Sequence, residues 1–141
     1  MTDSHQKKIF EIKKNILAHS TPEGRYNAIM EMGRRLPPMA QDQKIPENIV
    51  AGCQSILYLN AKLRGGQVFF EASSDALISA GLAAVLIAAY SGETPEAILK
   101  CPPTFLTDLG IIGSLSPSRS NGLAQIHLRM KREALKFLVS V

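Results

Sequence analysis

The first third of the chain carries apolar residues at the spacing of amphipathic helices. Apolar side chains recur every three or four positions through residues 4–19 and again through residues 22–36, which places them on one helix face. Thr21 is suited to cap the second of these helices. The polar, proline-containing stretch 37–48 then predicts a loop.

Short runs of strand-forming residues follow this loop. Residues 49–51 and 56–63 are rich in β-branched, aromatic and long aliphatic side chains, and residues 67–71 repeat the pattern after the pair Gly65-Gly66. Two consecutive glycines between strand-like runs mark a hairpin turn. The sequence therefore predicts a small antiparallel sheet of about three strands.

Helical spacing returns in the second half of the chain. Residues 75–90 are almost entirely apolar, and they predict a buried helix with a cap at Ser73 or Ser74. A final helix is predicted after Pro117, with an apolar stripe that ends near Leu138. Helices that precede and follow one small sheet predict the α+β class, with the helices packed against the sheet.

Length and composition fit one domain that spans residues 1–141, with residues 1–20 as an N-terminal helical segment. The chain has 141 residues, of which 45% are hydrophobic and 20% are charged, and this composition excludes global disorder. Its longest apolar run is shorter than the roughly 20 residues that cross a membrane, and its first residues lack a secretory or transit signal. We therefore expect a cytoplasmic protein with no membrane partner.

The net charge of +4 is concentrated at the two ends of the chain. Residues 1–20 hold four basic and two acidic side chains, residues 118–141 hold five basic and one acidic, and residues 21–117 hold seven basic and nine acidic. Basic terminal helices are compatible with an acidic protein partner. Aromatic residues make up only 6% of the chain and form no RNA-binding motif, so we expect no nucleic-acid partner.

Cys53 is the strongest candidate for a chemically active residue. It lies between two strand-like runs, and Gly52 before it permits backbone conformations that other residues disfavour. A cysteine on a loop that is fixed at both ends is positioned and accessible, as a nucleophile must be. The alternative is a small buried hydrophobic residue. Cys101, followed by two prolines near a predicted helix end, is interpreted as a bystander.

Other common kinds of site are not indicated. The three histidines do not have the spacing of metal ligands, and the two cysteines form neither a CxxC redox motif nor a four-cysteine zinc site. Gly110 and Gly113 are not followed by the third glycine of a dinucleotide fingerprint, and no GxSxG motif occurs. We therefore expect no metal and no bound cofactor.

Arg119 is a second candidate for the site. It lies in the predicted first turn of the last helix, where a positive charge is unfavourable for the helix dipole. This unfavourable interaction with the helix dipole is offset if the guanidinium binds an anion or lowers the pKa of a thiol. The alternative is a solvated surface arginine.

Several short motifs occur in the order of a known family. They are Arg25-Tyr26, Gly33 with Leu36-Pro37, Gly52-Cys53-Gln54-Ser55, Phe69 or Phe70, Ser74-Asp75-Ala76 with Gly81-Leu82, and Leu115-Ser116-Pro117-Ser118-Arg119 with Gly122. On these motifs, residues 20–135 resemble the SufE/CsdE family of sulfur-acceptor proteins. One departure is Tyr58, in the region where members commonly carry a tryptophan shortly after the serine.

The resemblance implies a function in sulfur transfer. Members of this family accept sulfane sulfur from the persulfide of a pyridoxal-phosphate cysteine desulfurase of the SufS or CsdA type, whose activity they stimulate. They carry it as a persulfide on the cysteine that Cys53 matches, and they pass it to an iron–sulfur scaffold of the SufB type. The implied fold is a SufE/IscU-like α+β domain. Such a protein is a covalent transfer partner rather than a stand-alone enzyme. The pyridoxal phosphate belongs to the desulfurase and not to this chain. We expect this chain to form at most a weak homodimer.

Within this resemblance, the other site residues receive supporting roles. Gly52, Gln54 and Ser55 are expected to shape the loop, Arg119 to stabilise the thiolate or persulfide, and Asp75 to favour the start of the following helix. A lone cysteine suits a carrier, because a neighbouring thiol would release the sulfur as sulfide and form a disulfide. We expect the loop to hold its thiol inward and to turn it outward on docking.

Two functions of other classes stay open. One is a thiol peroxidase or redox sensor that uses Cys53, whose signature is rapid formation of sulfenic acid with peroxide alone. The other is a non-catalytic interaction module whose basic terminal helices bind an acidic protein or nucleic acid. Binding of that kind would survive the loss of Cys53 and weaken with salt.

Overall fold

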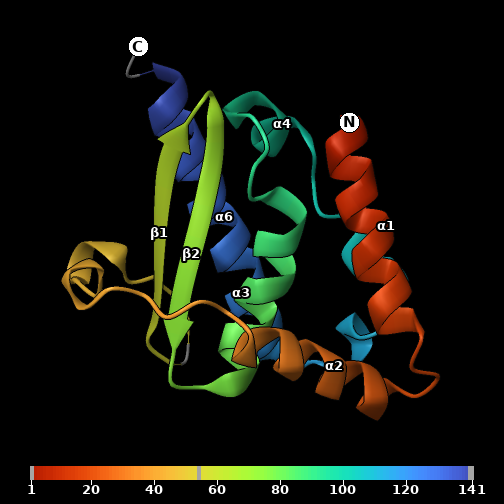
Figure 1. The fold of residues 1–141 in the computed structure, drawn as a ribbon. Helices are drawn as coiled ribbons and strands as arrows, with labels where there is room; N and C mark the ends of the chain where they lie inside the picture. The colour runs from red at the N-terminus through yellow and green to blue at the C-terminus, as the bar shows by residue number, and fades with distance from the viewer. Residues whose placement is uncertain (1, 54, 140–141) are drawn as a thin grey trace.

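The computed structural model describes residues 2–53 and 55–139, in which six α-helices and three short 3-10 helices accompany one β-hairpin (Figure 1). In chain order the elements are α1 Asp3–Leu17, α2 Pro22–Arg34, β1 Leu57–Arg64, β2 Gln67–Ser74, α3 Leu77–Tyr90, α4 Pro95–Lys100, α5 Phe105–Asp108 and α6 Pro117–Val139. No helix within the described residues is long and apolar enough to span a membrane. The α+β class predicted from the sequence is confirmed.

The sheet is a hairpin of two antiparallel strands. Gly65 and Gly66 form its turn with φ values of +59° and +79°, in the left-handed region that glycine adopts readily. The expected third strand does not form within the described residues, so the estimate of about three strands is corrected to two. Ile49 makes only an isolated bridge to Tyr58, because the chain turns at residues 51–52 directly afterwards.

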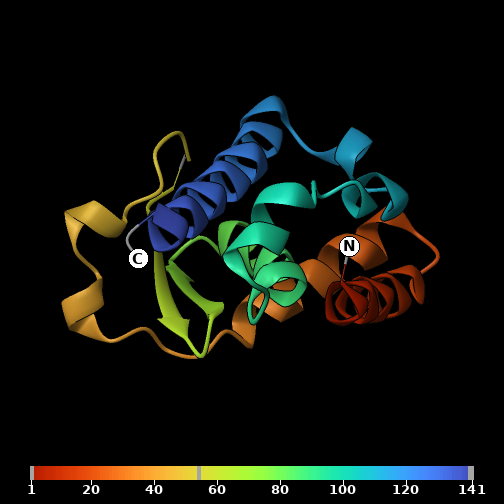
Figure 2. The ribbon, with the colours of Figure 1, turned by 90° about the horizontal axis from the view of Figure 1, so that it is seen from above.

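Helix α3 is the central element of the core. Its sequence is apolar on all sides, and most of its residues are buried. Helix α2 crosses it where Gly33 meets Gly81, since a Cβ on Gly33 would lie 2.6 Å from the backbone nitrogen of Gly81. Seen from above, α6 and the hairpin lie on one side of α3, and α1 and α2 lie on the other (Figure 2). The molecule thus has a helical side and a side formed by the hairpin and α6.

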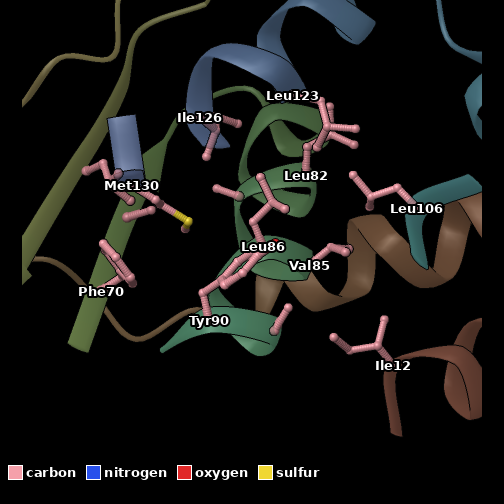
Figure 3. Packing of buried hydrophobic residues seen from close by; sticks show 14 of the residues in the cluster. Ile12, Phe70, Leu82, Val85, Leu86, Tyr90, Leu106, Leu123, Ile126 and Met130 are labelled. Carbon is pink, nitrogen blue, oxygen red and sulfur yellow. The ribbon is translucent and has the colours of Figure 1, made fainter. Parts of the chain in front are cut away.

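Side chains from α3, α6 and β2 fill the core between these two sides (Figure 3). Ile126 and Met130 of α6 and Phe70 of β2 surround Leu86 and Tyr90 of α3, and each of the five is at most 7% exposed. Complete burial of such a side chain contributes about 1.5–3 kcal/mol. This packing fixes the orientation of α6 relative to the hairpin.

Helix α1 is tied to the turn after α3 by a buried carboxylate. Glu93 is 3% exposed, and it accepts hydrogen bonds from Thr2 Oγ1 at 2.7 Å and from Ser4 Oγ at 2.8 Å. It also pairs with Lys8. His5 is fully buried against the last turns of α3. The N-terminal helix is therefore attached to the core through two buried polar side chains, Glu93 and His5.

The start of α3 differs from the prediction. The helix begins at Leu77 with Ala76 as its N-cap, whereas the sequence favoured a start at Asp75 after a serine cap. Ser74 instead ends β2, where its hydroxyl donates to the carbonyl of Ile56 at 2.8 Å and accepts from the nitrogen of Ala76 at 3.2 Å. Because the serine is used to close the hairpin, the chain bends through residues 75–76 before the helix begins, and Asp75 is exposed.

Candidate functional site

Cys53 lies in residues 51–56, a segment that we name the Cys53 loop. Gln54 falls within it but outside the described residues. The backbone nitrogen of Val50 donates to the carbonyl of Leu57 at 2.9 Å, which brings the two ends of the loop together. The loop is therefore held at its base by the start of the hairpin, although the sequence predicted a strand on each side of it and only the one that follows it forms.

Gly52 is required both by its conformation and by its surroundings. Its φ is +83°, which residues with a Cβ rarely adopt. A Cβ at this position would also lie 2.9 Å from Cγ of Gln125 on α6. The backbone of the loop therefore passes directly over the side chains of α6.

The thiol of Cys53 is half-buried and packs against the edge of the core. It faces Gly122 of α6, where a Cβ would lie 3.8 Å from Sγ. Burial raises the pKa of Cys53 above its ordinary value, because a thiolate loses solvation there. In this conformation burial disfavours the thiolate, which is the nucleophilic form of the side chain.

Three polar residues on one face of α6 surround the loop and the segment before it. Asn121, Gln125 and Arg129 follow each other at four-residue intervals, so they line the same side of the helix. The amide of Asn121 donates to the carbonyl of Gly52 at 3.1 Å. The guanidinium of Arg129 donates to the carbonyl of Ile49 at 2.9 Å. The first half of α6 therefore positions the candidate site.

A cavity of about 190 Å³ lies beside the Cys53 loop, between the start of α3 and the first turns of α6. Ser55 lines it from the loop, Leu82 from α3, and Arg119 and Gly122 from α6. Gly122 both borders this cavity and faces the thiol. Space for a small group is therefore present beside the loop, and Gly122 lies between this space and the sulfur.

Arg119 lies in the first turn of α6, as predicted, but its side chain is directed toward α2. The hydroxyl of Ser116 accepts from the backbone nitrogen of Arg119 at 3.3 Å and caps the helix. The guanidinium donates to the hydroxyl of Tyr26, and its central carbon lies 5.6 Å from the centre of that ring. Burial alone accounts for the raised pKa of Cys53, so a role of Arg119 toward the sulfur stays a prediction.

The remaining residues of the predicted site occupy different positions relative to the thiol. Ser55 is half-buried and lines the cavity, whereas Asp75 is exposed. Tyr58 is half-buried on β1. Cys101 is buried at the end of α4, where the hydroxyl of Tyr90 donates to its carbonyl at 2.6 Å. Cys101 therefore lies near the C-terminal end of α3, and the cavity beside the Cys53 loop lies near its N-terminal end.

Comparison with known proteins identifies the family. The family model described as SufE, Fe-S metabolism associated domain, matches residues 10–134. This chain belongs to the SufE family. The resemblance carried by the sequence motifs is thereby confirmed, and the chain is placed among proteins of Fe–S metabolism.

SufE-like relatives match most of the chain. It is 37% identical over 127 residues to an uncharacterized SufE-like protein of Synechocystis, a match that covers 90% of this chain and 80% of that protein. It is 37% identical over 129 residues to SufE-like protein 1, chloroplastic/mitochondrial, of Arabidopsis thaliana, covering 91% of this chain but 35% of that longer protein. A solution structure of a hypothetical protein from Thermus thermophilus matches with a TM-score of 0.78 and 26% identity, covering 94% of this chain and 97% of that one.

Several residues of the SufE motifs serve the fold rather than the thiol. Gly33 and Gly81 form the close crossing of α2 and α3. Arg25 donates to the carbonyl of His19 at 2.9 Å and to that of Leu109 at 3.2 Å, which joins the α1–α2 connection to the segment after α5. These SufE residues support the helical side of the molecule.

The sequence interpretation missed the polar stripe of α6. Asn121, Gln125 and Arg129 repeat at four-residue intervals beside the predicted apolar stripe of this helix. That spacing indicates a polar face, but it does not indicate which segment the face contacts. The contact with the Cys53 loop emerges only when the SufE fold brings residues about 70–80 positions apart together.

Proposed function

We propose that this SufE-family protein accepts sulfane sulfur from a cysteine desulfurase on Cys53 and delivers it to an iron–sulfur scaffold. The observation that carries the proposal is a single half-buried thiol in a loop that is fixed at its base and held at its tip by an exposed contact. The other cysteine of the chain, Cys101, lies near the opposite end of α3. A helix of 14 residues is about 20 Å long, so the two thiols do not react with each other.

The proposed transfer is an exchange at sulfur. The thiol of Cys53 first loses its proton to solvent, and the thiolate attacks the outer sulfur of the donor persulfide. An S–S bond forms at Cys53 while the S–S bond of the donor breaks, and the donor cysteine leaves as a thiolate. Delivery repeats the step, with the acceptor as nucleophile and Cys53 as the leaving thiolate. The chain needs no cofactor of its own for this, because the pyridoxal phosphate belongs to the desulfurase.

A lone, sheltered thiol suits such a carrier. A second thiol close by would attack the inner sulfur of the persulfide, release sulfide and form a disulfide. A persulfide open to solvent would also react with small thiols and oxidants. The partial burial of Cys53 against Gly122 supports storage of the sulfur between the two transfers.

The loop must open for either transfer, because burial raises the pKa of Cys53 and limits access to its sulfur. Ile56, at the end of the loop, is 60% exposed. An exposed apolar side chain next to the reactive residue suits the burial of surface by a docked partner. Docking of the desulfurase at this loop would then exclude small thiols at the moment when the sulfur is exposed.

Incubation with a desulfurase, pyridoxal phosphate and cysteine tests the proposal. The peptide that contains Cys53 is expected to gain one sulfur atom, about 32 Da. Desulfurase turnover is expected to rise, because each accepted sulfur frees the donor cysteine for another cycle. Cys53→Ser is expected to abolish both effects, and Cys101→Ser, the matched control, is expected to retain both. Sulfur loading and stimulation that persist in Cys53→Ser would contradict the proposal.

A peroxidatic function fits this site less well. Peroxidatic cysteines act as accessible thiolates of lowered pKa, whereas burial raises the pKa of Cys53. Treatment with peroxide alone, followed by trapping of sulfenic acid, distinguishes a peroxidatic function from sulfur transfer. Formation of sulfenic acid at Cys53 faster than sulfur loading would favour the redox function.

A further inference from the structure

The two strands of the hairpin differ at their outer edges, and the edge of β2 is covered by the turn after α3. Val68 donates its backbone N–H to the carbonyl of Glu93 at 2.9 Å, and its own carbonyl accepts from the nitrogen of Gly92 at 2.7 Å. The nitrogen of Phe70 donates to the hydroxyl of Ser91 at 3.0 Å. The outward backbone groups of β2 are therefore paired within the molecule along this stretch.

The edge of β1 is covered only where the strand begins. The nitrogen of Val50 donates to the carbonyl of Leu57 at 2.9 Å, and an isolated bridge follows at Tyr58. In an antiparallel strand the backbone groups of alternate residues point to the same edge, so those of Ala61 and Leu63 point outward as those of Leu57 do. Among the described residues, no segment other than β2 forms a backbone hydrogen bond with Ala61 or Leu63. We name residues 61–64 the β1 open edge.

The β1 open edge lies at a basic end of the molecule. The end of α6 lies beside the end of β1 (Figures 1 and 2). Residues 61–67 hold two basic and no acidic side chains, and residues 130–139 hold three basic and one acidic. These two short segments together carry as much excess positive charge as the whole chain, whose net charge is +4. The electrostatic potential around this edge therefore attracts anionic groups.

Side chains along the β1 open edge alternate between the two faces of the hairpin. Lys62 and Arg64 lie on one face and are exposed, and Leu63 lies on the other face and is 46% exposed. Lys62 is 4.0 Å from the carboxylate of Glu71. The guanidinium of Arg64 lies 5.2 Å from the centre of the Phe69 ring, and it pairs with no carboxylate among the described residues. A strand beside β1 would meet cations on one face and an apolar side chain on the other.

We propose that the β1 open edge docks an extended, acidic polypeptide segment in which acidic and apolar residues alternate. Its backbone pairs with the outward N–H and C=O groups of Ala61 and Leu63, as in the addition of a strand to a sheet. Its acidic side chains face Lys62 and Arg64, and its apolar side chains cover Leu63. The surface contains neither Cys53 nor the Cys53 loop, so the proposal does not depend on sulfur transfer.

Two other occupants fit this edge less well. A second copy of the chain, paired through the same edge, would bring Lys62 and Arg64 of one copy close to the same residues of the other. Like charges across neighbouring strands are destabilising, and lysine on an edge opposes such pairing. An anionic lipid surface would meet the charge but leave the outward backbone groups unpaired. The open edge and the positive charge together favour an acidic polypeptide.

A fluorescein-labelled peptide of alternating glutamate and valine tests the proposal, with fluorescence anisotropy as the readout. The peptide is expected to bind, and to bind more weakly as salt is added, because salt screens exposed charges. One control peptide has the same composition but holds its valines and glutamates in two separate blocks. The other alternates lysine and valine. Both are expected to bind at least about tenfold more weakly, since each loses the charge or the alternation that the edge requires.

Hydrogen exchange followed by NMR shows where the peptide lies. The amides of Ala61 and Leu63 are expected to exchange rapidly in the free protein and slowly in the complex. The amide of Lys62 points toward β2, where its register partner is Phe69, so it is expected to be protected in both states. This alternation distinguishes the addition of a strand from a purely electrostatic contact. Protection of Ala61 and Leu63 that grows with protein concentration alone would show self-pairing and overturn the proposal.

Two variants of β1 test the backbone and the charges separately. Ala61→Pro removes an outward N–H and leaves the bonds to β2 in place, and it is expected to weaken binding about fivefold. The double variant Lys62→Glu, Arg64→Glu is expected to lose the glutamate–valine peptide and to gain the lysine–valine peptide. Only a folded edge can exchange one peptide for the other, so this result decides the matter even if Ala61→Pro does not fold.

Lys7→Glu, Lys14→Glu is the matched control, because it changes the net charge by the same amount. Both lysines are exposed on α1, which lies on the side of α3 away from the hairpin (Figure 2). This variant is expected to keep its preference for the glutamate–valine peptide. Equal binding of the alternating and block peptides, or an equal loss in both double variants, would overturn the proposal. Binding to phosphatidylserine vesicles without binding to the peptide would also overturn it and assign the basic end to a lipid surface.

Discussion

Helix α1 and the tip of the Cys53 loop are both attached to the rest of the molecule by polar side chains, but under different solvation. The carboxylate of Glu93 is 3% exposed and accepts hydrogen bonds from Thr2 and Ser4 besides its pair with Lys8. The tip of the Cys53 loop is bonded to α6 through the exposed amide of Asn121. The first attachment consists of several charge-assisted, part-buried contacts to a buried carboxylate, and the second is a neutral bond in contact with water.

The difference separates a fixed scaffold from a movable tip. Hydrogen bonds to a buried carboxylate are costly to break, because the carboxylate is left without partners where water is scarce. An exposed neutral bond is replaced by water at less cost, so the opening that the proposed function requires does not need unfolding of the whole chain. Strong polar contacts thus occur where the fold must persist, and weak ones occur where the proposed function requires motion.

The largest effect on stability is expected in the fixed scaffold, at the crossing of α2 and α3. Gly81→Ala places a Cβ 2.6 Å from the carbonyl oxygen of Ile29, and backbone atoms cannot move aside unless the helices separate. We expect the free energy of unfolding to fall by about 3 kcal/mol, measured by denaturant titration. Gly113→Ala is the control, since no described atom lies within 4 Å of a Cβ there. Equal stability of the two variants would show that the crossing adapts and is not rigid.

The second-largest effect on stability is expected at Glu93. Burial by itself raises the pKa of this carboxyl, but hydrogen bonds from Lys8, Thr2 and Ser4 and the charge of Lys8 together hold it below its ordinary value. Its stabilising contribution is therefore complete above the unfolded pKa of about 4.3, and it is lost as the pH falls through the lower folded pKa. Glu93→Gln is expected to cost about 2 kcal/mol at neutral pH and to flatten the acid side of the stability–pH curve.

Glu96→Gln provides the control for this pH dependence, because Glu96 is exposed in the first turn of α4. It is expected to change the free energy of unfolding by less than about 0.5 kcal/mol. Thermal or urea unfolding at several pH values between neutral and acid compares the three chains. If Glu93→Gln and the wild type lose stability in parallel on acidification, the buried carboxylate is not what fixes α1.

Local signals in the sequence predicted most of the elements on both sides of this comparison. Thr21 caps α2 through its hydroxyl, as expected, and the structure shows that Thr94 caps α4 in the same way. These predictions succeed because a cap depends on residues within about one helical turn. Residues 49–51 failed as a strand, since so short a run extends only where the chain continues beside a partner, and here it turns.

Contacts between segments far apart in the chain could not be predicted from the sequence. The motifs singled out Cys53, but Asn121 bonds to a carbonyl 69 positions away. The unfavourable position of Arg119 at the start of α6 is explained by Tyr26, 93 positions away. Likewise, the raised pKa of Cys53 depends on burial against α6, which requires the assembled fold.

The smallest effect on stability is expected at the contact between Arg119 and Tyr26, which joins the fixed scaffold to the region of the loop. Tyr26→Phe removes the hydroxyl that accepts from the guanidinium, but it keeps the aromatic ring beside it. The bond is exposed, so the free energy of unfolding is expected to fall by less than about 1 kcal/mol. Arg119 also lines the cavity beside the loop, and its release from Tyr26 leaves the charge free to bind an anion there.

The rate of sulfur loading on Cys53, measured by rapid quenching and mass spectrometry, decides whether Arg119 stabilises the sulfur anion or only the fold. If its charge stabilises the thiolate or persulfide, Arg119→Gln slows loading severalfold, while Tyr26→Phe leaves loading unchanged or faster. Arg119→Lys, which keeps the charge but loses the planar donor head, should give an intermediate rate. Equal slowing by Tyr26→Phe and Arg119→Gln would instead assign Arg119 to the fixed scaffold, because the bond to Tyr26 would then be what both variants had lost.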